Sequence, residues 1–127
     1  MAAHPAGDVY DWYTRGMELL EAQSPAAAAA LLEHASRAEP ASRSVREALA
    51  RAQFNAGHFA AARDNFAVII ESNPTDDYAH FGMGLACTKL GSFDDAAEHL
   101  ALAAAMRPDN LHYATALRHA RAARERE

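Results

Sequence analysis

The sequence predicts an all-α protein made of tandem helix-turn-helix units. Of its 127 residues, 33 are alanine, the strongest helix former, whereas the β-branched and aromatic residues that favour strands are sparse. A spacing of 34 residues also runs through the chain, most clearly in Pro40, Pro74 and Pro108. Self-similarity at this period is typical of stacked helix pairs, and the length fits a single domain.

The same spacing holds at several other places in the sequence. The matching sets are Gly16, Ala50 and Gly84; Ala28, Ala62 and Ala96; Gly57 and Gly91; and Phe59 and Phe93. Five sets in one register, without an insertion, indicate a true internal repeat even in an alanine-rich chain.

Each period divides into two amphipathic helical halves joined by a turn. Ser24 and Pro25 are typical of an N-cap and a first helical residue, and Gly91 suits the left-handed position that ends a helix. Ser92 is then expected to accept a hydrogen bond from a free N–H of the next helix, and Pro108 stops the last helix of the third period. The expected helices span residues 9–22, 25–38, 43–56, 59–72, 77–90, 93–106 and 111–125.

These residues resemble the tetratricopeptide repeat (TPR) family, whose pattern is W-x2-L-G-x2-Y, then A-x3-F, then P. The matching residues are Trp12, Gly16, Ala28, Leu32 and Pro40; Leu49, Ala50, Ala62, Phe66 and Pro74; and Met83, Gly84, Ala96, Leu100 and Pro108. The resemblance implies a right-handed α-solenoid of three repeats, 9–42, 43–76 and 77–110, followed by a capping helix at 111–127. Residues 1–8 are expected to form a flexible N-terminal segment.

Two features of the pattern concern packing. Arg46 and His80 stand at the tryptophan place, and Gln53 and Cys87 stand at the tyrosine place, so the helix contacts there depart from the family pattern. In the capping helix, one face is expected to pack on the last repeat while arginines lie opposite. That face comprises Leu111, Ala114, Leu117 and Ala120.

In the TPR family the first helix of each repeat lines a concave groove that holds a peptide or a partner helix. The resemblance assigns to that groove Tyr10, Tyr13, Met17, Leu20, Glu47, Arg51, Phe54, Tyr78, Phe81 and Leu85. An apolar, aromatic lining favours an amphipathic helix laid in the groove, and the small Ala48 and Gly82 leave room for it. We therefore expect a non-catalytic interaction module, an adaptor or scaffold, that binds an apolar or amphipathic helical segment of a partner protein.

Two alternatives stand beside this interpretation. Tyr10, Tyr13 and Phe81 can instead pack on neighbouring helices or on the chain's own termini. The repeats can also drive assembly of a homo-oligomer, with a second copy covering the groove or an end face.

Some family members grip the C-terminal carboxylate of a chaperone with basic side chains. The corresponding places here are uncharged: Tyr13, Met17, Ala48, Tyr78 and Gly82. A chaperone-tail clamp is therefore not expected.

Composition and motifs argue against several other functions. The seven histidines lack the spacing of a helical metal site, and the single Cys87 forms neither an internal disulfide nor a thiolate metal site, so no enzyme, metal or cofactor is expected. A net charge of −5 with one lysine, and the absence of a long apolar run, argue against nucleic-acid binding and a membrane span. Without a visible secretory signal, we expect a cytoplasmic protein, and the excess of arginine over lysine suggests a bacterial one.

Overall fold

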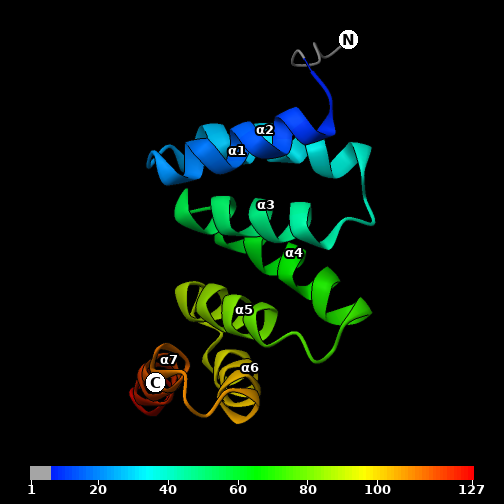
Figure 1. The fold of residues 1–127 in the computed structure, drawn as a ribbon. Coiled ribbons are helices and arrows are strands. Elements are labelled where there is room, and N and C mark those ends of the chain that lie inside the picture. The colour runs from blue at the N-terminus through cyan, green and yellow to red at the C-terminus, as the bar shows by residue number, and fades with distance from the viewer. Residues whose placement is uncertain (1–6) are drawn as a thin grey trace.

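The computed structural model describes residues 7–127, which form seven α-helices and no strand (Figure 1). The helices are α1 (Val9–Glu21), α2 (Pro25–Ala38), α3 (Arg43–Asn55), α4 (Phe59–Ser72), α5 (Asp77–Leu90), α6 (Phe93–Met106) and α7 (Leu111–Glu125). The predicted all-α class and the seven predicted helices are confirmed. The expected flexible segment 1–8 lies outside the described residues except for Gly7 and Asp8, and Asp8 caps α1.

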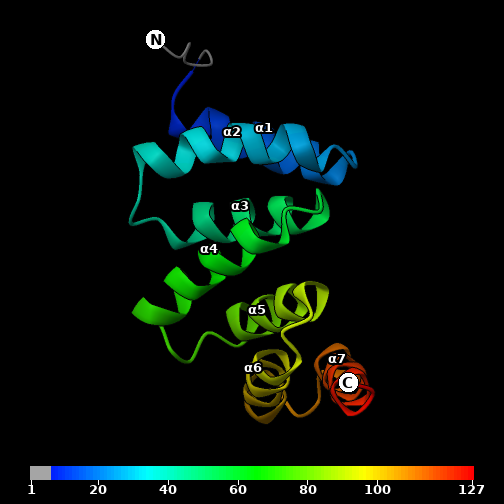
Figure 2. The ribbon, with the colours of Figure 1, turned by 180° about the vertical axis from the view of Figure 1, so that it is seen from behind.

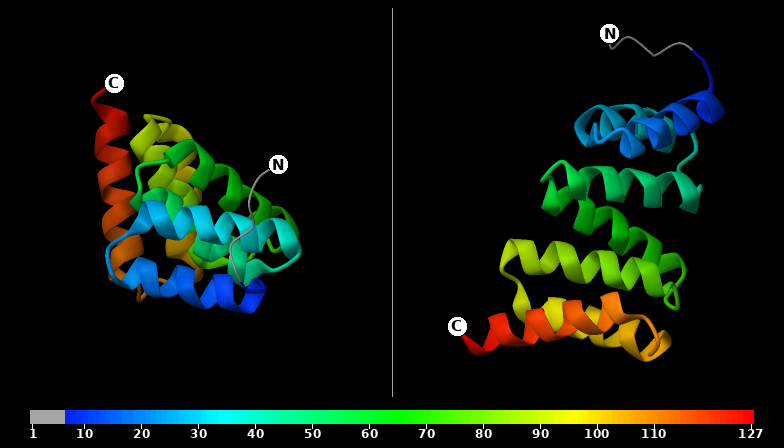
Figure 3. Two further views of the ribbon diagram at one scale, coloured as in Figure 1. Left: turned by 90° about the horizontal axis from the view of Figure 1, so that it is seen from above. Right: turned by 60° about the vertical axis from the view of Figure 1, so that its left-hand side comes forward.

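The helices form two layers. Each helix packs against the next in sequence, and α1, α3, α5 and α7 also contact one another in that order. The inner helices α1 and α3 face the viewer in Figure 1, whereas the outer helices α2 and α4 are in front when the molecule is seen from behind in Figure 2. Along the stack the helices rotate, so that α7 lies across the direction of α1 and α2 (Figure 3). The result is a short solenoid with its termini at opposite ends.

The core depends on glycine and alanine at the 34-residue spacing. A Cβ added to Gly16 would lie 2.6 Å from Cγ of Leu32, and one added to Gly84 would collide with Leu100. Leu32 and Leu100 are fully buried in the spaces that these glycines leave. The close approach of the two helices in the first and third repeats therefore requires a missing side chain on the inner helix, and the second repeat has the small Ala50 at this place.

Inner and outer helices begin differently. The inner helices start at Asp8, Ser42, Asp76 and Asn110, whose extended backbones let their side chains accept helix N–H groups. The outer helices start at Ser24, His58 and Ser92, where ψ is 63°, 68° and 69°, and no side chain makes a capping hydrogen bond. The expected cap by the Ser92 side chain is therefore wrong, because the tight turn holds its backbone out of the extended conformation.

The turn inside each repeat contains one residue with positive φ. These residues are Gln23 (63°), Gly57 (85°) and Gly91 (80°), spaced 34 apart. Behind each, an amide bonds back to the inner helix, from Ser24 to Leu19, from His58 to Gln53 and from Ser92 to Cys87. Glycine accepts this conformation freely, whereas glutamine is strained in it.

We predict that Gln23→Gly raises the free energy of unfolding by about 1 kcal/mol, because it removes the left-handed strain of a side-chain-bearing residue. The matched substitution Gly57→Gln should lower the free energy of unfolding by a similar amount. Nothing lies within 4 Å of a Cβ added at Gly57, so the left-handed backbone conformation is what opposes the new side chain. Urea unfolding of both variants measures the two effects. Equal stability of all three proteins would show that the turn tolerates either residue.

Polar contacts replace the tryptophan in the second and third repeats. Arg46 donates to the carbonyl of Pro40 at 3.0 Å and to Oδ1 of Asn65 at 2.9 Å. At the equivalent places, Nε2 of His80 lies 2.8 Å from the Pro74 carbonyl and its Nδ1 lies 3.0 Å from Nδ1 of His99. Since a carbonyl only accepts, His80 donates from Nε2, and its Nδ1 accepts a hydrogen bond from the Nδ1–H of neutral His99.

The histidine pair makes the fold sensitive to acid. Burial, followed by the nearby His80, lowers the pKa of His99 from its ordinary value of 6.5, while Glu98 and Asp95 act weakly in the opposite direction. A depressed pKa stabilises the folded state above about pH 6.5, and that contribution is lost as the pH falls through the folded-state pKa.

We therefore predict that the free energy of unfolding falls between about pH 7.5 and about pH 5, and falls less in His99→Asn. The asparagine amide can still donate to His80 but does not titrate. Urea unfolding at several pH values measures the difference. An identical pH dependence in both proteins would contradict the coupling of the two imidazoles.

Candidate protein-interaction groove

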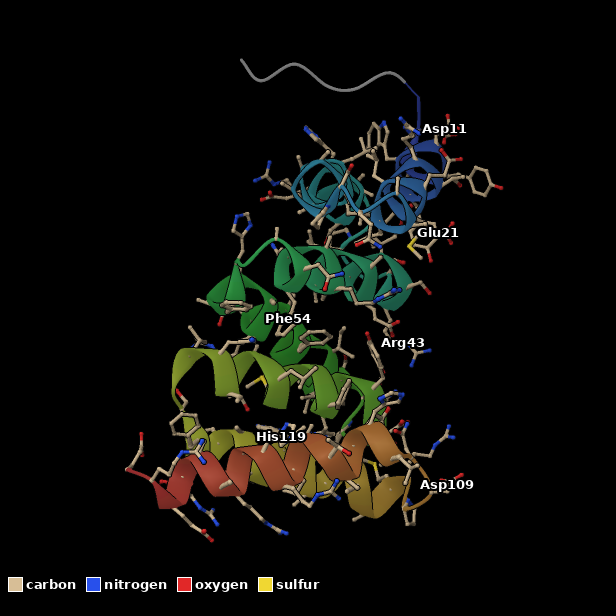
Figure 4. All side chains as sticks on the ribbon, turned by 90° about the vertical axis from the view of Figure 1, so that its left-hand side faces the viewer. Asp11, Glu21, Arg43, Phe54, Asp109 and His119 are labelled. Carbon is tan, nitrogen blue, oxygen red and sulfur yellow. The ribbon has the colours of Figure 1, made fainter. Side chains whose placement is uncertain are left out.

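Two adjoining hollows open on the inner surface between α3, α5 and α7. The first has a volume of about 140 Å³ and is lined by Arg51, Phe54, Asn55, Phe66, Tyr78, Phe81, Gly82 and Leu85. The second has a volume of about 510 Å³ and is lined by Phe81, Leu85, Thr88, Lys89, Leu111, His112, Thr115, Ala116 and His119. Phe81 and Leu85 belong to both, so the hollows are continuous; together they are called the α3–α5–α7 groove. Figure 4 shows Phe54 and His119 on either side of α5.

Of the ten residues assigned to a groove from the sequence, the structure brings five together around one hollow and leaves the others elsewhere. Arg51, Phe54, Tyr78, Phe81 and Leu85 come together around the first hollow. Tyr13 and Met17 pack against the core of the first repeat, in which Leu20 is only 8% exposed. The other two line neither hollow: Tyr10 is 75% exposed, and Glu47 is half-buried. Of the ten assigned residues, those that line the first hollow thus all belong to the second and third repeats.

The floor of the groove is a chain of aromatic rings from three helices. Phe66 of α4 meets Tyr78 of α5 edge to face at 6.3 Å between centroids. Tyr78 is 6.2 Å from Phe81, and Phe81 is 4.7 Å from Tyr113 of α7. Such contacts add to the stabilisation that comes from burial, so this floor is a continuous apolar surface held by ring contacts between helices.

Gly82 opens this floor to the outer layer. A Cβ at this position would collide with the ring of Phe66, which lies directly beneath it. Phe66 is 2% exposed overall, and yet its edge reaches the first hollow because no side chain covers it. The small residue noted in the sequence therefore leaves space above a buried ring.

Sequence reasoning missed the contribution of α7. The second hollow is lined by His112, Thr115, Ala116 and His119, from the segment that was expected to cap the last repeat and was not assigned to the groove. They follow Tyr78, Phe81, Gly82 and Leu85 by 34 residues, so continuing the period into α7 would have found them. The expectation that Leu111 packs on the last repeat is wrong, because Leu111 is 77% exposed at the mouth of the hollow.

Tyr113 fixes α7 instead. Its side chain is buried, and its hydroxyl donates to Oδ2 of Asp77 at 2.7 Å, joining α7 to the start of α5. Burial and this hydrogen bond to the Asp77 carboxylate raise the pKa of Tyr113, so the phenol remains protonated and remains a donor. Arg107 approaches the same carboxylate at 3.8 Å.

The charged groups of the groove are few. Arg51 is half-buried and makes no hydrogen bond or ion pair with any residue in 7–127. Burial raises the pKa of Tyr78, with Glu47 adding to the effect and Arg51 opposing it. Burial, then the charge of Asp76, also raises the pKa of Glu47.

Two observations concern the chemistry of the side chains in the described residues. Within the described chain, no three His, Cys, Asp or Glu side chains are placed to hold a metal ion. Cys87 is 1% exposed, and burial raises the pKa of its thiol, which keeps it in the unreactive protonated form. None of the helices described is both long enough and apolar enough to cross a membrane.

Stacked helix pairs with an uncovered inner groove define a helical-repeat protein. The sequence profile of the tetratricopeptide repeat family matches residues 13–77 and 47–111. The chain therefore belongs to the TPR family, as its residue pattern predicts. A comparison with curated proteins gave no match.

Solved structures of TPR proteins share the fold. The first TPR domain of Spaghetti (RPAP3), bound to the HSP90 peptide SRMEEVD, is 18% identical with a TM-score of 0.84, covering 91% of this chain and 92% of that one. YrrB, described as a TPR protein with an unusual peptide-binding site, is 22% identical with a TM-score of 0.82, covering 87% of this chain and 57% of YrrB. MamA from Desulfovibrio magneticus RS-1 is 15% identical with a TM-score of 0.88, covering 93% of this chain and 67% of that one.

We predict that Tyr113→Phe lowers the free energy of unfolding by about 1–2 kcal/mol, because the variant loses a hydrogen bond to a carboxylate. Tyr10→Phe is the matched control, since the Tyr10 side chain is 75% exposed and should be neutral. Urea unfolding measures both, and hydrogen exchange should show faster exchange in α7 of Tyr113→Phe. Unchanged exchange in α7 would mean that the hydroxyl does not hold this helix.

Proposed function

We propose that this protein is a non-catalytic protein-interaction module, an adaptor or scaffold, that binds an apolar or amphipathic helical segment in the α3–α5–α7 groove. The observation that carries the proposal is a continuous apolar surface on the inner helices, with Leu85 contributing to both hollows. Uncovered apolar surface of this kind marks an interaction site.

The dimensions of the groove fit side-chain anchors on a helix. The first hollow, about 140 Å³, is close to the roughly 150 Å³ cavity that accepts a benzene ring. The second is wider and extends along α5 and α7, which suits the next turns of the same helix. The peptide complex of the Spaghetti domain and the peptide-binding site of YrrB support peptide binding on this fold. Location in a bacterial cytoplasm stays a prediction from composition.

The test is a display selection of helical peptides of about four turns, with leucine or phenylalanine on one face. Peptides recovered by the wild-type protein should bind Leu85→Gln at least about tenfold more weakly, because a buried apolar contact worth more than about 1.4 kcal/mol is replaced by an amide. Fluorescence anisotropy measures the affinities, and circular dichroism checks folding.

Leu102→Gln is the matched control, because Leu102 is 44% exposed on the outer helix α6 and lines neither hollow of the groove. Equal loss in both variants would place binding outside the groove. The alternative, assembly into a homo-oligomer, is tested by light scattering after size exclusion. A concentration-dependent oligomer that Leu85→Gln disrupts would favour assembly and contradict the adaptor role.

A further inference from the structure

Every charged or ionisable side chain that lines the α3–α5–α7 groove, apart from the Tyr78 phenol, is basic. Arg51 lies in the first hollow, and Lys89, His112 and His119 lie in the second. No aspartate or glutamate is among the residues that line either hollow. This is contrary to the composition, because the whole chain carries a net charge of −5 and has one lysine.

Acidic side chains are present elsewhere on the inner helices. Glu21 at the end of α1 is exposed, and the half-buried Glu47 lies on α3 one turn before Arg51, with which it interacts electrostatically. Figure 4 shows Glu21 at the α1 end and His119 at the α7 end of the molecule. A segment bound in the two hollows is therefore lined by basic groups, with Glu47 as an acidic neighbour of Arg51 outside them.

Because Arg51 lines the first hollow, the affinity for a bound segment depends on the charge of that segment. Arg51 is half-buried beside aromatic rings and makes no hydrogen bond or ion pair within residues 7–127, although the Glu47 carboxylate one turn earlier on α3 attracts it electrostatically. A purely apolar occupant would cover this cation without supplying an acceptor, and a basic occupant would add repulsion. A carboxylate on the occupant would instead pair with the guanidinium in a site from which water is partly excluded.

The basic groups of the second hollow are accessible for the same role. Lys89 is exposed at the end of α5, with its Nζ 6.0 Å from the centroid of the Phe59 ring. His112 and His119 are exposed two turns apart on α7. Their spacing along one face places two imidazole groups, which can donate N–H hydrogen bonds, along the rim rather than at a single point.

We infer that the partner segment is an acidic amphipathic helix, with apolar anchors in the two hollows and carboxylates flanking them toward Arg51, Lys89 and the α7 histidines. This inference rests on the proposed function and adds the chemistry of the partner. The segment belongs to another protein, and a second copy of this chain is the competing occupant that the test must distinguish.

The experiment is a display selection in which the apolar positions of the helical peptide are fixed and the flanking positions vary among Glu, Gln and Lys. Binders to the wild-type protein should be enriched in Glu and depleted in Lys. A recovered peptide should bind about three- to tenfold more tightly than its Glu→Gln counterpart, with the difference shrinking as salt is added.

Charge-reversed proteins make the assignment specific. The double variant Lys89→Glu with His119→Glu should shift the enrichment toward Lys, and Arg51→Gln should weaken the Glu peptide by about three- to tenfold. Arg121→Glu is the matched control, because Arg121 is exposed on α7 and lines neither hollow. It should leave the preference for Glu unchanged, and circular dichroism checks that each variant folds.

The outcomes separate the two proposals. Binders with no preference among Glu, Gln and Lys, or with a preference that Arg121→Glu alters as strongly as the groove variants, would overturn the acidic partner and leave the helix-binding role standing. Failure to recover any binder would overturn both. A dimer that the selected peptide dissociates would show that a second copy occupies the groove and would overturn the inference.

Discussion

The fold depends on the contact that each outer helix makes with two inner helices. α2 packs on α1 and α3, α4 on α3 and α5, and α6 on α5 and α7, whereas contacts between the inner helices themselves are sparse. Close approach in the first and third repeats needs the missing side chains at Gly16 and Gly84, into whose space Leu32 and Leu100 fit. Because the outer helices supply most of the burial, one side of each inner helix stays uncovered. The groove is therefore a consequence of how the solenoid gains its stability.

The second repeat solves the same packing problem in another way. Its inner helix has Ala50 where the other repeats have glycine, and the larger Phe66 reaches forward to Gly82 in the next repeat. The ring thereby connects two repeats and also forms part of the groove floor. The second repeat thus differs from the others at two places of the period, and its larger Phe66 side chain is shared by the core and the candidate site.

The sequence predicts the parts of the structure that the period controls. The helix bounds and the left-handed turn at Gly91 follow from local residue preferences repeated at fixed spacing. The side-chain caps do not follow in the same way, because Ser92 has a capping residue type but the backbone of a tight turn. Nor does the polar pair of His80 with His99, since residues on separate helices meet only through packing that a one-helix pattern does not encode.

Five of the ten residues that the resemblance assigns to a groove line the first hollow, and the other five line neither hollow. Tyr13, Met17 and Leu20 already pack in the first-repeat core. A bound partner would therefore bury little further apolar surface there. At the other end, no eighth helix covers α7 in the described chain, and its inner face continues the lining begun by Tyr78 and Phe81. A capping helix has a solvent-exposed outer side, but its inner side has the same position in the stack as the inner helices of the repeats before it. The end of the stack is thus where apolar surface, positive charge and open space coincide.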